Sequence, residues 1–409
     1  MIPFYELKSA PVHSVLLLRS REEALNYPAA DISLGFCDRC MFISNVVFNA
    51  DLHEYSTKYE ATQAYSSTFN AFHKELAKSL IERFDLHKKN IIEIGCGQGE
   101  FLHLLCELGD NHGVGFDPAY DKRRSEFVSD NMHTFIRDFY SEKYKDFHGD
   151  FVCCKMTLEH IPNTLEFVTG IRAIIGKHSD TIVFFQIPNV TRILQEMAFW
   201  DIYYEHCSYF SEDSLRYLFV KSGFDVIDLW RAYDDQYLMI AARPDIDYSA
   251  PEGLSQKSKK MSIRIRRKPD EKSGCETNQG FLDNSSSAEK MRHRIDYFSK
   301  NHLKVVNSWR EKINELKQQG KRIVIWGAGS KGVAFLTTLK IQDEIDYAVD
   351  INPNKHGTYM AGTGQQIVAP DFLREYRPDV VIVMNPIYCQ EIKHELEKMD
   401  IDATILPVS

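Results

Sequence analysis

Residues Ile91–Leu102 read IIEIGCGQGEFL, and this stretch decides how the chain folds. A short apolar run surrounds an acid, and glycines follow at positions 95, 97 and 99. A strand, a glycine-rich turn and a helix in this order form the nucleotide-binding unit of open α/β sheets. Glycines suit such a turn because the backbone passes close to the ligand there. The question is which nucleotide this turn binds.

The spacing of the glycines does not fit the dinucleotide fingerprint. That fingerprint is GxGxxG and would need a third glycine at position 100, where the chain has Glu. The residues Glu93, Gly95, Gly97 and Gly99 form ExGxGxG instead, a spacing typical of S-adenosylmethionine (SAM) methyltransferases. We therefore predict that this loop binds SAM.

Three later segments support a SAM site. GVGFD ends in Asp117, 18 residues after Gly99, where a carboxylate can accept both ribose hydroxyls. In IRDFY, Asp138 can accept from the adenine amino group, and Phe139 can stack nearby. TLEHIP follows the next strand, and we include its Leu158 among the cofactor contacts. All of them lie at predicted carboxyl ends of strands, where open α/β sheets bind ligands.

Composition narrows the class of protein. The chain has 409 residues, 44% of them hydrophobic and 26% charged, which is usual for a globular protein of two or three domains. Its net charge of −9 argues against a general basic surface for nucleic acid. We see no transmembrane run and no signal-peptide pattern, so we expect a cytoplasmic protein with no membrane partner. Nine scattered cysteines favour reduced thiols. The oligomeric state is left open.

The pattern of strands and helices divides the chain. From 66 to 244, short apolar strands alternate with helical stretches, which predicts a parallel sheet covered by helices. Only a short turn around Asp234 separates the last two strands, so they are antiparallel. This layout is similar to that of class I methyltransferases, a Rossmann-like α/β fold. We predict a small N-terminal knuckle in 1–65, this SAM domain in 66–244, a polar linker and long helix in 245–319, and a second Rossmann-like α/β domain in 320–409.

An insert after the predicted strand TIVFFQIP carries groups suited to proton transfer. They are Tyr203, Tyr204, Glu205, His206 and Tyr209. Imidazole supplies a base near neutral pKa, and tyrosine hydroxyls can donate to a developing oxyanion. Because the insert leaves the sheet edge where the SAM methyl group should point, we predict a catalytic role for His206. The alternative is a tyrosine-rich loop that packs two domains together.

Seven segments along nearly the whole chain give a resemblance. They are LGFCDRCMFI, YSSTFNAF, IIEIGCGQGEF, TLEHIP, IYYEHCSYFS, GAGSKG and VDINPNKHGTYMAGTGQQIVAP. The chain resembles the three-part SAM-dependent C-methyltransferases that act on nucleotide-linked keto-deoxysugars. The resemblance implies that His206 removes a proton next to the sugar ketone. It also implies that Tyr203, Glu205 and Tyr65 line the site and hold the enolate or substrate, and we expect Tyr209 to contact the substrate.

Members of this family usually carry a zinc-binding N-terminal domain with two cysteine pairs. Here only Cys37 and Cys40 remain, and two thiolates do not fill a tetrahedral structural site. His13 or His53 would have to complete it. We expect a knuckle packed without metal, with zinc at Cys37 and Cys40 as the alternative. The missing pair also leaves the substrate open, and O-methylation of a sugar or small metabolite by the same His206 is an alternative.

The C-terminal module supports a rival function. Gly327, Gly329 and Gly332 satisfy GxGxxG after the strand RIVIW, and Asp350 follows 18 residues later. By pattern alone this is a site for a dinucleotide, so an NAD(P)-linked oxidoreductase is an alternative. The resemblance implies instead a domain that contacts the nucleotide end of a small-molecule substrate. Lys331 and Lys355 would then meet its phosphates.

Overall fold

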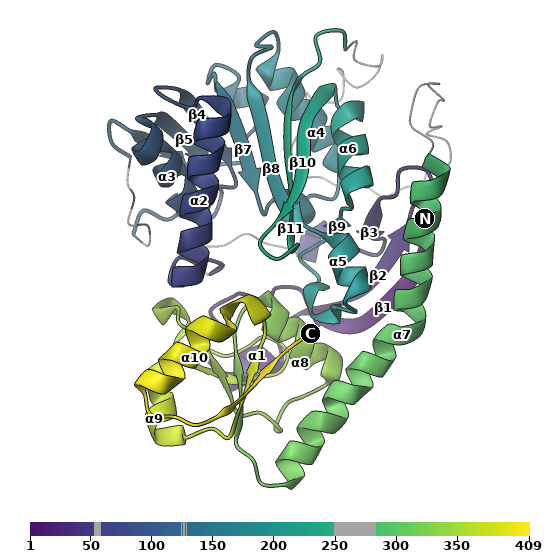
Figure 1. The fold of residues 1–409 in the computed structure, drawn as a ribbon, viewed down its shortest axis with the longest axis vertical. Helices are drawn as coiled ribbons and strands as arrows, with labels where there is room; N and C mark the ends of the chain where they lie inside the picture. The colour runs from purple at the N-terminus through teal and green to yellow at the C-terminus, as the bar shows by residue number, and fades with distance from the viewer. Residues whose placement is uncertain (53–58, 124, 126, 128, 249–283) are drawn as a thin grey trace.

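The computed structural model describes residues 1–52, 59–123, 125, 127, 129–248 and 284–409. The polar linker predicted to begin at 245 therefore lies mostly outside the described residues. The chain builds three sheets, with the largest above the C-terminal sheet in Figure 1 and the N-terminal strands beside both. No described helix is long and apolar enough to cross a membrane.

The largest sheet confirms the predicted methyltransferase layout. Its seven strands run in the order β10-β11-β8-β7-β4-β5-β6, and β11 is antiparallel to both β10 and β8. The strands are β4 (Asn90–Ile94), β5 (His112–Phe116), β6 (His133–Ile136), β7 (Phe151–Lys155), β8 (Ile182–Pro188), β10 (Phe224–Ala232) and β11 (Tyr237–Pro244). The helices of this part are α2 (Ser67–Phe84), α3 (Glu100–Gly109), α4 (Thr164–Ile175), α5 (Val190–Gln195) and α6 (Glu212–Lys221).

Both faces of this sheet are buried, which explains why its inner strands read as continuous apolar runs. Alternate residues of β4 pack on opposite faces: Ile91 joins one apolar core with α2 and α3, while Ile92 and Ile94 join the core on the other face. Such a sheet leaves only its strand ends accessible, so polar residues that follow β4, β5 and β7 gather at one edge.

The N-terminal region is a larger unit than a knuckle. It is an antiparallel sheet of β1 (Ile2–Pro11), β2 (Ala29–Phe36) and β3 (Ile43–Asn45), with helix α1 (Arg21–Leu25) between β1 and β2. The CxxC segment is only the turn between β2 and β3. The fourth strand, β9 (Ser208–Tyr209), comes from the insert and pairs with β3. The N-terminal sheet therefore holds one end of the segment that carries His206.

The C-terminal module is a five-stranded parallel sheet in the order β14-β13-β12-β15-β16. Its elements are β12 (Ile323–Trp326), α8 (Ser330–Leu339), β13 (Tyr347–Val349), β14 (Gln366–Val368), α9 (Leu373–Tyr376), β15 (Val380–Val383), α10 (Cys389–Lys398) and β16 (Thr404–Pro407). The predicted long helix is α7 (Asn284–Gln318), which packs on β1, α5 and α8 and leads into this module. Short 3-10 turns complete the chain at Ala50–Leu52, Glu142–Tyr144, Leu158–His160, Phe199–Asp201, Pro353–Lys355, Pro370–Phe372 and Pro386–Tyr388.

One apolar core joins the N-terminal sheet, the insert, α7 and the C-terminal module. At its centre Phe335 of α8 is fully buried. Its ring stacks on Phe199 of the insert at 5.8 Å between centroids and meets Trp309 of α7 edge-on at 5.4 Å. This core packs the C-terminal module against the insert and so holds the two in a fixed relative position.

We expect Phe335→Ala to lower the free energy of unfolding by about 3–5 kcal/mol, because it leaves a cavity where three parts of the chain meet. Urea denaturation measures this change. Tyr297→Ala is the matched control: its ring is 56% exposed on α7, and its cost should stay within about 0.5 kcal/mol. Equal costs for the two variants would contradict the role given to this core.

Candidate active site

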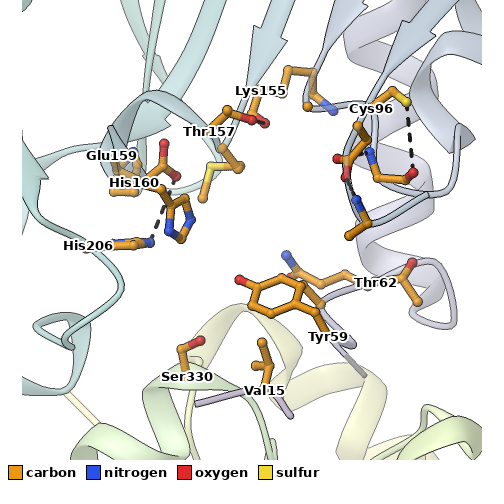
Figure 2. A pocket seen from close by; sticks show the side chains of 18 of the residues that line it. Val15, Tyr59, Thr62, Cys96, Lys155, Thr157, Glu159, His160, His206 and Ser330 are labelled. Atoms are coloured by element: carbon orange, nitrogen blue, oxygen red, sulfur yellow. Dashed lines mark hydrogen bonds and ion pairs between the residues drawn. The ribbon is translucent and has the colours of Figure 1, made fainter. Parts of the chain in front are cut away.

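A cavity of about 2090 Å³ separates the methyltransferase sheet from the C-terminal module. Its wall contains the glycine loop, the segments that follow β5, β6 and β7, the insert, and the loops that follow β12 and β13. Figure 2 shows His206, His160 and Glu159 on one side of this space, Cys96 of the glycine loop opposite them, and Ser330 at the base. The predicted cofactor loop and the predicted catalytic insert therefore face the same cavity.

The glycines of the ExGxGxG loop serve two different needs. Gly95 and Gly97 line the cavity with φ angles of +71° and +57°. A Cβ atom on Gly95 would lie 2.1 Å from Thr157 Oγ1. Gly99 does not line the cavity; it begins α3, and a Cβ there would lie 2.6 Å from the Phe135 ring. Gly99 is therefore needed for packing, and its predicted contact with the cofactor stays a prediction.

The predicted ribose and adenine residues lie at the cavity wall. Asp117 accepts from the Gly97 amide at 2.9 Å and from the Ala119 amide at 2.7 Å, and burial raises its pKa. Asp138 accepts from Lys143 Nζ at 2.8 Å, and that hydrogen bond lowers its pKa. Phe139 is 46% exposed and presents its ring to the cavity wall. Asp117 thus also orders the loop that it is expected to serve.

Leu158 lies away from the cavity, whereas the two residues that follow it line the cavity. Leu158 is fully buried in the core below the sheet and does not line the cavity. Glu159 and His160, which follow it in the same 3-10 turn, do line the cavity. Of the segment TLEHIP, only Leu158 was predicted as a site residue; Glu159 and His160 were not. The available signal was their position after β7, at the same edge as the insert.

Glu159, His160 and His206 form a compact cluster. One side-chain ligand atom of each lies within 4.8 Å of the others, so within the described ranges this group has the spacing to share a metal ion. His206 Nε2 lies 4.0 Å from Glu159 Oε1, and the two imidazole rings meet edge-on at 4.8 Å. Neither carboxylate oxygen of Glu159 has a hydrogen-bond partner among the described residues, and burial raises its pKa to about 8.

Main-chain contacts dock the insert against this turn. The Cys207 amide donates to the Glu159 carbonyl at 2.9 Å. His160 Nδ1 lies 3.0 Å from the Glu205 carbonyl, and since that oxygen only accepts, Nδ1 carries the proton. The remaining nitrogen of His160 is then an acceptor. The insert and the turn after β7 are therefore one rigid wall.

Tyr203 and Glu205 of the insert point in different directions. Tyr203 lines the cavity as predicted, with its ring 4.1 Å from that of His206. Glu205 does not line the cavity: its carboxylate is buried against the Ser14 amide at 3.1 Å and His13 Nδ1 at 3.3 Å. The Glu205 carboxylate therefore contacts the N-terminal segment, and its predicted role in the reaction stays a prediction.

Tyr209, a predicted substrate contact, also lies behind the cavity wall. It is 3% exposed, belongs to β9, and does not line the cavity. Its hydroxyl lies 3.4 Å from the Tyr203 carbonyl, so it supports the insert from behind. Tyr65 does line the cavity, but on the side of the C-terminal module, where its hydroxyl lies 3.5 Å from Asn354 Nδ2.

The two predicted phosphate ligands, Lys331 and Lys355, line the cavity in ion pairs. Lys331 Nζ lies 2.8 Å from Asp201 of the insert. Lys355 Nζ lies 3.0 Å from Asp350, the acid that would bind a ribose in a dinucleotide site. The same oxygen, Oδ2, also accepts from the Ala328 amide at 3.1 Å, and Oδ1 accepts from the Asn352 amide at 2.9 Å. Both oxygens that a dinucleotide would need therefore already face protein donors.

The N-terminal thiols do not fit a structural zinc site. Within the described ranges, no group of three possible metal ligands includes Cys37 or Cys40. His13, one candidate to complete the site, instead bonds to Glu205, and His53 lies outside the described residues. Burial raises the pKa of Cys40 to about 11, so this thiol favours its protonated form. Two cysteines without further ligands leave a tetrahedral site half filled.

Comparison with known proteins agrees with this geometry. A family model described as a methyltransferase domain matches residues 69–229, and one described as a C-methyltransferase C-terminal domain matches residues 262–406. The chain therefore combines a match to a methyltransferase domain with a match to a C-methyltransferase C-terminal domain. It is a SAM-dependent methyltransferase, and the match of the GxGxxG module to a C-methyltransferase domain favours this activity over the oxidoreductase alternative.

Individual proteins are more distant. C-methyltransferase NovU of Streptomyces niveus is 24% identical over 92% of this chain and 85% of its own length. Magnesium protoporphyrin IX methyltransferase of Synechocystis, solved with bound SAH, is 14% identical over 45% of this chain and 89% of its own, with a TM-score of 0.34. A putative SAM-dependent methyltransferase of Listeria monocytogenes is 14% identical over 43% of this chain and 99% of its own, with a TM-score of 0.33.

We expect Glu159→Gln to stabilise the protein more at pH 9 than at pH 5. Burial raises the pKa of Glu159 from 4.5 to about 8, so between these values the folded chain holds a proton that the unfolded chain has lost. Stability from this group is therefore present at low pH and is lost as pH rises towards 8. Glutamine has nearly the same shape as glutamic acid, but its side chain does not titrate.

Thermal unfolding of both proteins from pH 5 to pH 9 measures the difference. Glu166→Gln is the control, because Glu166 belongs to α4 outside this cluster and shares the same edge of the cavity. A difference between Glu159→Gln and wild type that does not change with pH would contradict the raised pKa.

Proposed function

We propose that the enzyme transfers the methyl group of SAM to a carbon next to the ketone of a nucleotide-linked keto-deoxysugar. The single observation that carries this proposal is the shared cavity. One continuous space connects the glycine loop, the His206 cluster and the glycine turn of the C-terminal module. A methyl acceptor that reaches all three must be long, with a reactive end near His206 and a recognition end near α8.

The size of the cavity supports two ligands. Sites for a single small molecule usually measure about 300–1,000 Å³, and this cavity of about 2090 Å³ is twice the upper value. SAM would occupy the part beside Asp117 and Phe139. The remainder extends to Ser330 and Asn352 of the C-terminal module.

Methylation of carbon requires a base, and we assign this role to His206. SAM supplies an electrophilic methyl group, and the acceptor carbon must lose a proton to attack it. His206 is 4% exposed at the cavity wall, where water competes little for its nitrogen. Glu159 Oε1 lies 4.0 Å from His206 Nε2; because burial raises the pKa of Glu159 to about 8, this carboxyl group would favour the imidazolium only once it has lost its proton. Tyr203, whose ring lies against His206, would donate to the enolate oxygen.

The C-terminal module would bind the nucleotide end of the substrate. Ser330 begins α8, so unpaired main-chain amides of the first helical turn face the cavity, and such a terminus favours phosphate groups. Lys331 and Lys355 add positive charge there, and a diphosphate would compete with Asp201 and Asp350 for them. We also place the reaction in the cytoplasm, because the eight cysteines among the described residues are all free thiols.

Transfer of ¹³C-methyl from labelled SAM to a nucleotide-linked keto-deoxysugar tests the proposed reaction. We expect the label on carbon, with a carbon–carbon coupling to the neighbouring ring atom in the NMR spectrum. Label on oxygen would show the O-methyltransferase alternative to be right. No label on any sugar nucleotide, with SAM still bound, would overturn the substrate class.

Exchange of the substrate proton in D₂O tests the base. We expect the wild type with bound S-adenosylhomocysteine to exchange the proton next to the ketone, and His206→Asn to lose at least about 100-fold of this rate, as is typical of general base catalysis. Proton NMR of the substrate measures the rate without methyl transfer.

His302→Asn is the matched control for this exchange, since His302 is also buried but belongs to α7 and bonds to the Phe298 carbonyl outside the cavity. Treatment with EDTA separates proton transfer from metal-assisted enolisation at the same cluster. Full exchange in His206→Asn would show that another group is the base.

A further inference from the structure

Two buried ionisable side chains of opposite sign lie beneath the glycine loop and take no part in the proposed proton chemistry. Lys155 is the last residue of β7, and Glu93 lies in the neighbouring strand β4. They are 8% and 2% exposed, and both line the cavity. No ion pair within 4.0 Å joins them, although each affects the pKa of the other.

Lys155 has weak compensation for its buried charge. Its Nζ lies 3.1 Å from His73 Nε2 of α2 and 3.7 Å from the centre of the Phe101 ring. Burial lowers the pKa of His73 to about 2, so this imidazole is neutral and acts as the acceptor. A neutral acceptor and an aromatic face hold the ammonium group in place. They do not neutralise it, and burial lowers the pKa of Lys155 as a consequence.

Glu93 is a buried carboxyl group with one oxygen that lacks a hydrogen-bond donor among the described residues. The Leu102 amide in the first turn of α3 lowers the pKa of Glu93, against the larger effect of burial. The oxygen without a donor is Oε2, which is buried. Burial raises the pKa of Glu93 to about 8. Buried polar atoms in proteins are nearly always paired, so an orphaned oxygen at a cavity wall indicates a ligand donor.

The two groups together match one ligand feature. The methionine end of SAM is a zwitterion, with an α-ammonium and an α-carboxylate on the same carbon. We propose that Lys155 binds the α-carboxylate and Glu93 binds the α-ammonium of the methionine end. Each side chain then gains a direct partner of opposite charge, whereas in the protein alone the two groups act on each other without an ion pair within 4.0 Å.

This assignment adds a residue that the ExGxGxG pattern does not contain. The glycine spacing identifies a SAM loop and Asp117 identifies the ribose end, but neither distinguishes SAM from an analogue without the amino-acid charges. Lys155 and Glu93 make the site selective for the intact methionine end. The alternative is that Lys155 only positions α2 through His73, and that Glu93 only orders the start of α3.

Truncated ligands separate the two roles. Decarboxylated SAM lacks only the α-carboxylate, so its affinity relative to SAM reports on the partner of that group. Charge-assisted hydrogen bonds contribute about 1.5–3 kcal/mol, which corresponds to about 10–100-fold in affinity. We expect calorimetry to show that wild type binds SAM tighter than decarboxylated SAM by that factor. We expect Lys155→Met to bind the two within about threefold of each other.

The same design applies to Glu93. The thioether analogue of S-adenosylhomocysteine in which hydrogen replaces the α-amino group is the matching ligand. We expect wild type to prefer S-adenosylhomocysteine by about 10–100-fold and Glu93→Gln to lose that preference. Lys177→Met, at an exposed position after α4, is the control and should keep both wild-type preferences.

Several outcomes overturn the proposal. If the wild type binds SAM and decarboxylated SAM with equal affinity, the proposal is wrong. This result needs no variant, so it holds even if Lys155→Met fails to fold. The proposal is also wrong if Lys155→Met folds and still prefers SAM over decarboxylated SAM as the wild type does. Lys155 would then only position α2 through His73. Because these are binding measurements, a failure to methylate sugar nucleotides leaves them unaffected, whereas absence of any SAM binding would contradict the methyltransferase activity itself.

Discussion

The buried carboxylate of Glu205 is the interaction on which the geometry of the active site depends. It is 1% exposed, and burial alone would raise its pKa, but hydrogen bonds from His13 and Ser14 lower it, so the group is held as a charge. The Ser14 hydroxyl also lies 2.7 Å from Ser330 Oγ at the start of α8. One charge thus ties the insert to the N-terminal segment and, through that segment, to the C-terminal module. A buried charge tolerates little displacement of its partners, so His206, the next residue, inherits a fixed position.

The parts of the fold that sequence analysis predicted are those with local signals. The strands around Glu93 read as apolar runs because both faces of the sheet are buried, and the antiparallel closing hairpin followed from the short turn at Asp234. The N-terminal sheet had no such signal. Its last strand, β9, is two residues long and pairs with β3, whose residues lie more than 160 positions earlier in the chain. Period-two patterns cannot be recognised in so short a strand.

The same reasoning explains why the sequence does not show which side chains of the insert face the cavity. YYEHCSY contains several residues capable of catalysis, and only the pairing of the insert with β3 and with the turn after β7 decides which of them face the cavity. Tyr203 and His206 do; Glu205 and Tyr209 do not. Glu159 was missed for the opposite reason: its burial and raised pKa arise from the insert packed against it, which no feature of TLEHIP reports.

Two glycine turns in one chain show how similar backbones serve different ligands. Asp117 and Asp350 follow the second strand of their sheets, and each accepts from an amide of its glycine turn and from the amide two residues onward. The difference is Lys355, which pairs with Asp350, whereas Asp117 has only amide donors. A carboxylate paired with a buried lysine is a poor acceptor for ribose hydroxyls, because a neutral donor would have to replace a charged one. The GxGxxG spacing therefore gives the C-terminal module a similar turn, while Lys355 occupies the carboxylate that would accept ribose hydroxyls. The start of α8 is then the part of this turn that we propose binds the substrate.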